Sequence, residues 1–367
     1  MAPTMKALLE PSIRVVELGE SLAGSYCGRL LQQLGAGVTA VEPTRRSRLR
    51  SMPPRLPGSD VSATYTALTE GKRIVRADFD QPAGRASIEE LLAGADVVIM
   101  SGTLREWEER ALSPADVRRL APTAVVGRVT TFGDVGPYAQ WAGGELQAQA
   151  LGGLMNMIGE PDAEPIRIGG YPAQYSTGLA LLAGISLGLF RKDNAGRGSS
   201  FSTSVIETVA HMEWKTAQTY AQEGKIAVRG WRQDPPLILP CRDGFFAFFY
   251  LPHDWDVVRK VVQDPRLDDE RFSTQPLRQE NRDELVAVLT EFTLRHNKVD
   301  LYHLTQAHRM TTGYVASISD LFADRQYLSR GFFDDVETPG FGPAKLPGAP
   351  WRWVAAPAPQ PQEGQVA

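Results

Sequence analysis

The sequence predicts an α/β protein with a largely parallel, doubly wound sheet. Short β-branched runs alternate with helical patterns through the first 200 residues. Glycine, proline or capping residues separate most of these runs, as they do in folded α/β chains. Strand–helix alternation of this kind places parallel strands in one sheet with helices on both faces.

The first cycle begins with a strand at 13–18, followed by a helix over 23–34 whose apolar residues recur at helical spacing. Gly35 ends that helix, and 38–42 forms the next strand. Ser113-Pro114 is a favourable helix start, with a capping hydroxyl and proline at the first position. The remaining strands are expected at 74–78, 96–100 and 124–130, and the remaining helices at 82–93, 114–120, 145–158 and 176–190.

Domain organisation follows changes in composition. Residues 43–60 are rich in arginine, proline and serine and predict a surface loop. From about 215 the chain becomes helical with aromatic-rich strands such as 245–251, which indicates a second, smaller domain. The proline-punctuated tail, 355–367, is expected to be disordered.

Composition excludes several classes of protein. Hydrophobic residues make up 43% of the 367, and the net charge is −4, which does not favour a nucleic-acid partner. No apolar run has the roughly 18 residues of a membrane span, and the start of the chain lacks a signal peptide pattern. Cys27 and Cys241 are expected to be free, buried thiols. These features predict a cytoplasmic protein with no membrane partner.

Three short motifs do not carry the chemistry that they suggest. Gly35-Ala36-Gly37 closes a helix instead of opening one, so it is a helix end and not a dinucleotide fingerprint. Gly184-Ile185-Ser186-Leu187-Gly188 lies inside an apolar helix, where a nucleophile elbow cannot form. The five histidines have no metal-ligand spacing, so no metal site is predicted.

Several segments in order resemble the class III coenzyme A-transferases, which include carnitine-CoA and formyl-CoA transferases and the α-methylacyl-CoA racemases. The similarity extends to about residue 350. It is carried by 13–18 through 41–43, Gly71-Lys72-Arg73 with Asp78, 95–98, 132–138, 196–198, 240–244 and 320–333.

The resemblance implies a Rossmann-like large domain, a smaller inserted α+β domain and an intertwined dimer. We therefore expect a large domain from 1–200 plus 316–354, a linker helix over 201–224 and a small domain over 225–315. The dimer would be formed with a second copy or with a paralogue.

The family's nucleophile is missing. These transferases place an aspartate in a G-x-x-x-x-D-x-x-x-G context, where it attacks the acyl-CoA thioester. In the matching stretch, 169–178, Gln174 takes that place. An amide is a poor nucleophile, and losing a nucleophile can cost roughly six decades of rate. The usual aspartyl transfer is therefore not expected of this chain alone.

The racemase chemistry is not expected either, because its aspartate also falls at Gln174 and its histidine at Gly144. Glu145 matches a position that is usually acidic in the family. It is either a general base or orienting group near Gln174, or a cap of the helix that it starts. Tyr171 and Tyr175 are expected to line the same pocket.

The coenzyme A contacts implied by the resemblance are also reduced. Leu22 and Ala23 fall where the family's backbone meets the pantetheine or adenine. Lys72, with Arg73 beside it, either pairs with a phosphate of CoA or is an ordinary solvated lysine. The arginines at 45, 46, 48 and 50 are either further phosphate contacts or part of a solvated loop. No permanently bound cofactor is expected, only CoA or an acyl-CoA as substrate.

Three functions remain open. The protein acts on an acyl-CoA or related thioester by isomerase, dehydratase or lyase chemistry, with Glu145 as base and Gln174 polarising the carbonyl. Alternatively, it is a catalytically silent subunit paired with an active paralogue, or a non-enzymatic binding protein. A well-formed pocket around Gln174 would favour the first function, and a collapsed one the third.

Overall fold

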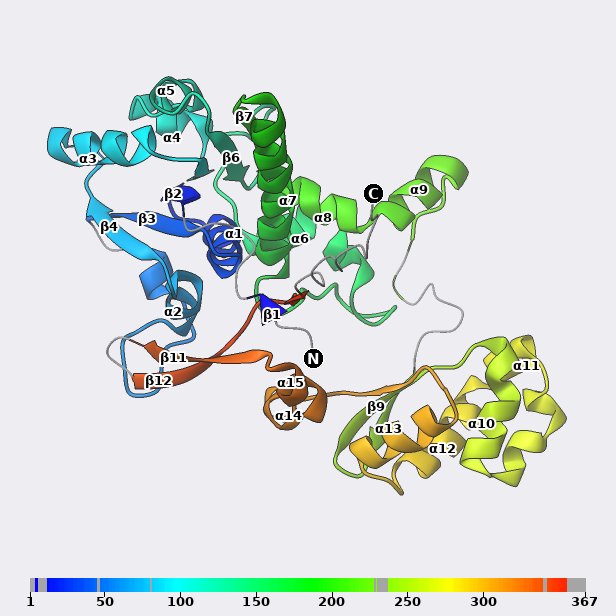
Figure 1. The fold of residues 1–367 in the computed structure, drawn as a ribbon. Helices are drawn as coiled ribbons and strands as arrows, with labels where there is room; N and C mark the ends of the chain where they lie inside the picture. The colour runs from blue at the N-terminus through cyan, green and yellow to red at the C-terminus, as the bar shows by residue number, and fades with distance from the viewer. Residues whose placement is uncertain are drawn as a thin grey trace, which may run out of the picture. The chain divides into compact units, whose positions relative to one another are not determined.

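The computed structural model describes residues 4–5, 12–44, 47–79, 81–227, 229, 237–338 and 342–354. It divides into two compact units (Figure 1). Unit 1 comprises Met1–Arg229 and Gly331–Ala367, and unit 2 comprises Gly230–Arg330. The predicted tail, 355–367, and two of the loop arginines, 45 and 46, lie outside the described residues.

A six-stranded sheet forms the centre of unit 1, and all its neighbouring strands run parallel. The strands lie in the order β4-β3-β2-β5-β6-β7. Successive strands are added toward one edge from β2 to β4 and toward the other edge from β5 to β7, so the switch point lies between β2 and β5. Ligands of open parallel sheets bind at such a switch point, beyond the carboxyl ends of the strands. The strands are β2 (Arg14–Leu18), β3 (Gly37–Pro43), β4 (Arg73–Ala77), β5 (Val97–Ser101), β6 (Val125–Thr130) and β7 (Ser199–Ser204).

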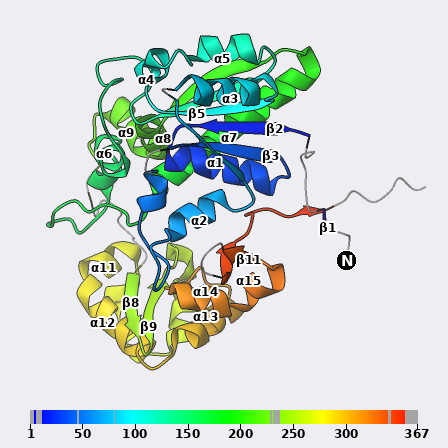
Figure 2. The ribbon, with the colours of Figure 1, turned by 90° about the vertical axis from the view of Figure 1, so that its left-hand side faces the viewer.

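Helices cover both faces of this sheet (Figures 1 and 2). One face packs against α1 (Leu22–Gln33) and α7 (Pro172–Ala195) through one apolar core, and the opposite face packs against α3 (Pro82–Ala93), α4 (Leu104–Glu109) and α5 (Pro114–Leu120) through another. The two cores use alternate residues of β2 and β5, since successive side chains of a strand point to opposite faces. The doubly wound α/β fold predicted from sequence is confirmed.

Shorter elements surround the sheet. They are η1 (Leu49–Ser51), α2 (Ala63–Thr69), α6 (Glu145–Leu151), η2 (Leu154–Met157), α8 (Val205–Met212), α9 (Trp214–Glu223), the paired strands β1 (Thr4–Met5) and β13 (Trp353–Val354), and the hairpin of β11 (Phe333–Thr338) and β12 (Gly342–Pro347).

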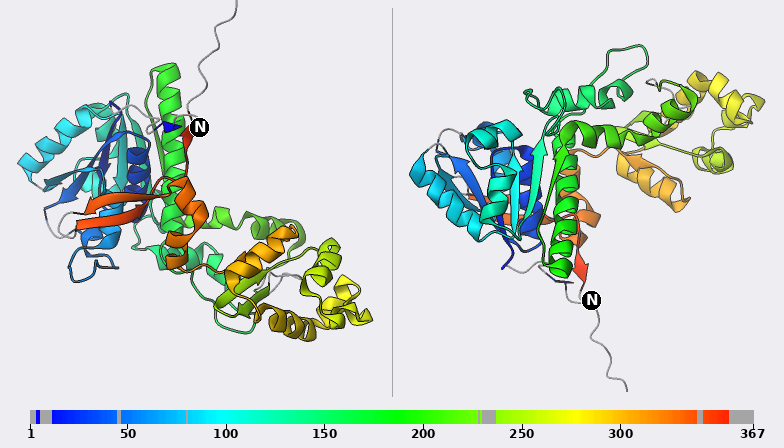
Figure 3. Two further views of the ribbon diagram at one scale, coloured as in Figure 1. Left: turned by 60° about the horizontal axis from the view of Figure 1, so that its bottom comes forward. Right: turned by 90° about the horizontal axis from the view of Figure 1, so that it is seen from above.

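The helix α7 is the longest element of unit 1 (Figure 3). It is long and apolar enough to cross a membrane by length and composition, but half of its apolar window is buried inside the protein. Ser186, in the G-x-S-x-G pattern, lies in the middle of this helix, and its hydroxyl donates a hydrogen bond to the carbonyl oxygen of Leu182. Gly178 lets α7 approach α1 closely, because a Cβ there would stand 2.8 Å from the carbonyl oxygen of Ala23.

The structure corrects the linker helix expected over 201–224. Residues 199–204 form β7, which pairs with β6, and two helices, α8 and α9, follow. The serine-rich sequence of this strand gave no apolar alternation because it lies at the edge of the sheet and pairs on one side only.

Unit 2 contains a three-stranded antiparallel sheet, β10-β9-β8, with helices packed around its aromatic core. It continues to Arg330 and not to 315, since Lys298 pairs with Asp320 at 2.6 Å and the Tyr314 hydroxyl donates to Asp324. Its elements are β8 (Leu237–Cys241), β9 (Gly244–Phe248), η3 (Pro252–Asp254), α10 (Trp255–Val262), η4 (Pro265–Asp268), η5 (Glu270–Phe272), α11 (Gln275–Glu280), α12 (Arg282–Thr293), α13 (Lys298–Ala307), β10 (Gly313–Tyr314), α14 (Ile318–Ala323) and α15 (Arg325–Arg330).

Both cysteines are free and buried, as expected. Cys27 lies on the buried face of α1, where burial, and next the nearby carboxylate of Glu17, raise the pKa of its thiol well above the ordinary value. A thiol of this kind is a core side chain and not a nucleophile.

Candidate active site

A cavity of about 410 Å³ opens beyond the carboxyl ends of β2, β5 and β6, at the switch point of the sheet. Its walls come from unit 1 alone. The lining residues are Glu20, Ser21, Leu22, Arg48, Leu49, Met52, Gly102, Thr103, Glu106, Val129, Thr130, Thr131, Phe132, Ala139, Trp141, Ala142, Gly143, Gly144, Glu145, Tyr171, Gln174 and Val205.

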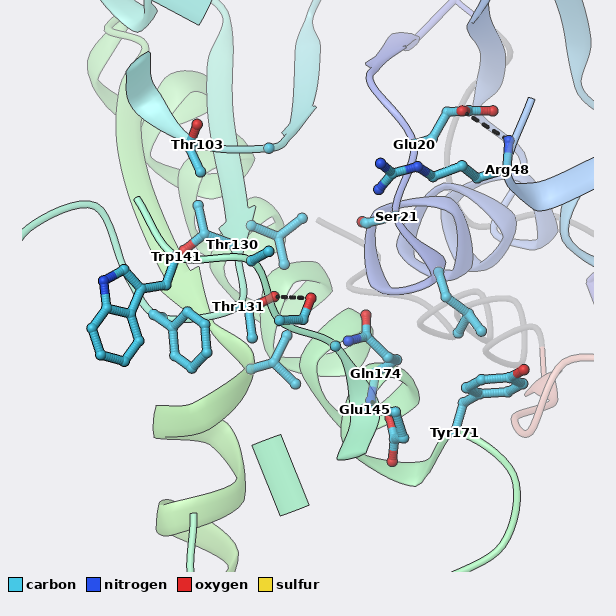
Figure 4. A pocket seen from close by; sticks show the side chains of 18 of the residues that line it. Glu20, Ser21, Arg48, Thr103, Thr130, Thr131, Trp141, Glu145, Tyr171 and Gln174 are labelled. Atoms are coloured by element: carbon cyan, nitrogen blue, oxygen red, sulfur yellow. Dashed lines mark hydrogen bonds between the residues drawn. The ribbon is translucent and has the colours of Figure 1, made fainter. Parts of the chain in front are cut away.

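Gln174 lies in the first turn of α7, and its side chain points into this cavity (Figure 4). The residue is 9% exposed. Within the described residues no hydrogen bond engages its side-chain amide, so the NH₂ and the carbonyl oxygen are both available to a ligand. The amide can donate to a developing negative charge, but it cannot act as a nucleophile.

Glu145 fixes this part of α7. Its Oε1 accepts hydrogen bonds from the backbone N–H of Ala173 at 2.9 Å and from the amide of Gln149 at 2.7 Å, and its Oε2 accepts from the N–H of Gln174 at 3.1 Å. The carboxylate therefore caps the amino end of α7, and not that of α6, the helix that it starts. An anion at a helix amino end satisfies free N–H groups and the helix dipole.

Gln149 extends this network. Its side chain is fully buried, and its amide exchanges two hydrogen bonds with the backbone of Ile168, in the segment before α7. Glu145 and Gln149, one helical turn apart on α6, thus hold both α7 and the chain leading into it.

The two tyrosines that were expected to line one pocket lie in different cavities. Tyr171 lines the cavity with Gln174, but Tyr175 does not. Tyr175 instead contacts Tyr26 with ring centroids 4.8 Å apart and lines a different cavity of about 400 Å³. Burial, and next the neighbouring Tyr26, raise the pKa of Tyr175. The expectation that Tyr175 faces the Gln174 cavity is therefore wrong, since adjacent helical residues point about 100° apart.

Of the predicted coenzyme A contacts Leu22, Ala23, Lys72 and Arg73, only Leu22 lines the cavity. Leu22 lines the cavity at the start of α1. The side chain of Ala23, also on α1, is fully buried where α1 meets α7, and the expected contact of its backbone with coenzyme A stays a prediction. Arg73 is exposed on β4, the edge strand of the sheet, and does not line the cavity.

Lys72 is neither a solvated lysine nor placed for a phosphate. Its side chain is fully buried beneath α1, where Nζ lies 2.6 Å from Oε1 of Glu17 and donates to the carbonyl of Ser25 at 2.7 Å. Burial lowers the pKa of Lys72 and raises that of Glu17, and the mutual attraction opposes both shifts. Lys72 is a structural cross-link between β2, α1 and the turn before β4.

Several lining residues were not expected from sequence. Glu20 and Ser21 follow β2, Thr103 follows β5, and Thr131 follows β6. The rule that parallel sheets bind ligands at the carboxyl ends of their strands would have selected them. Glu20 and Arg48 also line an adjoining cavity of about 270 Å³, which contains Trp107 and Arg110.

Relatives identify the kind of protein to which this site belongs. The sequence profile of CoA-transferase family III matches residues 11–365. The chain belongs to CoA-transferase family III. Within the described residues, no group of three or more histidine, cysteine, aspartate or glutamate side chains could hold a metal ion.

Individual family III members support this assignment over nearly the whole chain. The succinate–glutarate CoA-transferase of Agrobacterium fabrum is 30% identical over 345 residues, which cover 89% of this chain and 84% of the relative. The BbsE subunit of the succinyl-CoA:(R)-benzylsuccinate CoA-transferase of Thauera aromatica is 28% identical, covering 93% and 87%. A CaiB/BaiF family protein from Brucella suis has the same fold, with a TM-score of 0.83, 29% identity and coverage of 93% and 91%.

Proposed function

We propose that this family III protein binds a coenzyme A thioester in the Gln174 cavity and acts on its acyl group without an aspartyl intermediate. The supporting observation is the side chain of Gln174, which points into a cavity of about 410 Å³ from the amino end of α7. CoA or an acyl-CoA would be the substrate, with no permanently bound cofactor, and the protein would work in the cytoplasm.

The proposed role of Gln174 is electrostatic. Its NH₂ group would donate a hydrogen bond to the thioester carbonyl and stabilise negative charge that develops on that oxygen. Isomerisation, dehydration and lyase steps all pass through such charge next to the thioester. None of them requires a protein nucleophile.

Glu145 is better suited to orient Gln174 than to act as a base. Three donors already bind its carboxylate, two of them backbone N–H groups of α7. Taking up a proton would weaken the cap that fixes Gln174, so we assign proton transfer to substrate or solvent groups and orientation to Glu145.

A second candidate is a silent subunit of a heteromeric transferase. Two curated relatives, BbsE and the alpha subunit of the succinyl-CoA–L-malate CoA-transferase of Chloroflexus aurantiacus, are named as subunits. An exposed apolar stripe of α7, Leu179, Leu187 and Phe190, would suit burial in a homodimer or a heterodimer with a paralogue. The open cavity argues against a non-enzymatic remnant with a collapsed site.

A CoA-exchange assay tests the proposal. The purified chain is incubated with an acyl-CoA and a second carboxylic acid, and new thioesters are measured by mass spectrometry. We expect no exchange, together with saturable binding of the acyl-CoA. Efficient exchange by the chain alone would refute it, and exchange that appears only with an added paralogue would favour the silent-subunit candidate.

A further inference from the structure

The walls around Gln174 consist of apolar and hydroxyl-bearing side chains. Leu49 and Met52 come from the segment after β3, and Phe132 and Trp141 come from the segment after β6. Thr103, Thr130 and Thr131, which carry hydroxyl groups, line the same side of the cavity as Trp141 (Figure 4). Pockets of this composition bind uncharged groups, with a few polar atoms that set orientation.

The ionised side chains of the cavity are mainly carboxylates. Glu20, Glu106 and Glu145 line it, whereas Arg48 is the one cationic side chain among the described lining residues. The carboxylate of Glu106 accepts from the backbone N–H of Thr103, and that of Glu145 caps α7. Because neither carboxylate forms an ion pair within the described part of the chain, both add negative potential to the cavity.

Glu20 differs from the other two carboxylates in having a buried oxygen without a hydrogen bond. Its Oε2 accepts the backbone N–H of Arg48 at 3.1 Å, but its Oε1 is buried with no hydrogen-bond partner within the described residues. A buried acceptor of this kind favours a donor group and disfavours a second anion. Figure 4 places Glu20 beside Arg48 and across the cavity from Trp141.

We propose that the cavity selects a thioester whose acyl group is uncharged, aliphatic or hydroxylated, over one that carries a second carboxylate. This inference rests on the proposed function. A terminal carboxylate would lose its hydration among apolar walls. Among the described lining residues it would meet three carboxylates and one arginine. Curated relatives are named for succinate and glutarate, which are dicarboxylic acids, so the proposal separates this chain from them.

Butyryl-CoA and succinyl-CoA form a matched pair for the test, because both have four acyl carbons and differ by the terminal carboxylate. We expect the full chain to bind butyryl-CoA at least tenfold more tightly in calorimetric titrations at neutral pH. Glu20→Gln should reduce that ratio several-fold. Glu109→Gln removes the same charge from an exposed site on α4 outside the cavity, and should leave the ratio unchanged.

Other outcomes overturn the inference in distinguishable ways. Equal or tighter binding of succinyl-CoA, lost in Arg48→Gln, would make Arg48 a carboxylate receptor and refute the selection of uncharged acyl groups. Binding of neither thioester by a folded protein would refute the proposed function and the inference with it. Circular dichroism of each variant establishes folding before titration.

Discussion

The carboxylate of Glu145 accepts a hydrogen bond from the backbone N–H of Gln174 at 3.1 Å. The backbone of Gln174 is thus held by an acid 29 residues earlier in the chain. The side chain of Gln174 can therefore project into the cavity from a helix end that Glu145 holds in place.

Removing this support should destabilise α7. Glu145→Ala leaves two backbone N–H groups of the helix without their acceptor, and we expect a loss of about 1–2 kcal/mol in the free energy of unfolding. Urea titration measures it. Glu90→Ala, at an exposed position of α3, serves as the control and should remain within about 0.5 kcal/mol of wild type. A loss no larger than the control would contradict the capping role.

An acid introduced at position 174 should not produce CoA transfer. In Gln174→Asp the new carboxylate would share the amino end of α7 with Glu145, and Lys72 would remain buried against Glu17, where it cannot pair with a phosphate. We expect CoA exchange to stay at background in the mass-spectrometric assay. Measurable exchange by this variant would contradict this expectation and show that one carboxylate suffices for transfer in this cavity.

Lys72 should behave as a structural residue. Lys72→Met leaves the buried carboxylate of Glu17 without its cationic partner, and we expect the free energy of unfolding to fall by about 3–5 kcal/mol. Replacing both partners, Glu17→Leu with Lys72→Met, should recover most of it. The matched control is Arg73→Met, one residue further and exposed, with little expected change. An unchanged stability for Lys72→Met would refute the cross-link.

Asp96 should make stability depend on pH. Burial raises the pKa of Asp96, but the hydrogen bond from the Arg14 amide and the ion pair with Lys192 together lower it by more. The pKa of Asp96 therefore lies below the ordinary value. A depressed pKa contributes stability above the unfolded value of about 3.9, which is lost as the pH falls through the folded value.

Asp96→Asn should therefore be less stable than wild type by about 1 kcal/mol at pH 7, with the difference closing below pH 4. Urea titrations across pH 3–7 measure it. Asp193→Asn, exposed on α7, is the control. A difference that stays constant with pH would contradict the titration of Asp96.

Much of the fold could be predicted because its signals are local. The β-branched runs from residue 13 to 130 and the helix signals between them gave five of the six strands of the sheet. The sixth, Ser199–Ser204, was missed because an edge strand of serine and threonine carries no apolar alternation. The end of the small domain was placed at 315 instead of Arg330, because that boundary depends on side-chain pairs such as Lys298–Asp320.

The site was predicted in part for the same reason. Gln174, Glu145 and Tyr171 line one cavity, and all three were singled out from sequence. The positions of Lys72 and Tyr175 depend on partners distant in sequence, Glu17 and Tyr26, and no local pattern identifies such pairs. Glu20 was missed because its significance lies in the meeting of strand ends, whereas Arg48 was named only as one of four loop arginines.

Calorimetric titration with an acyl-CoA and with free CoA, for wild type and Gln174→Ala, tests the central claim most directly. We predict micromolar binding of the thioester by wild type, and at least tenfold weaker binding by Gln174→Ala, with free CoA affected less. No binding at millimolar ligand, or thioester binding that is indifferent to Gln174→Ala, would contradict a site organised around that amide.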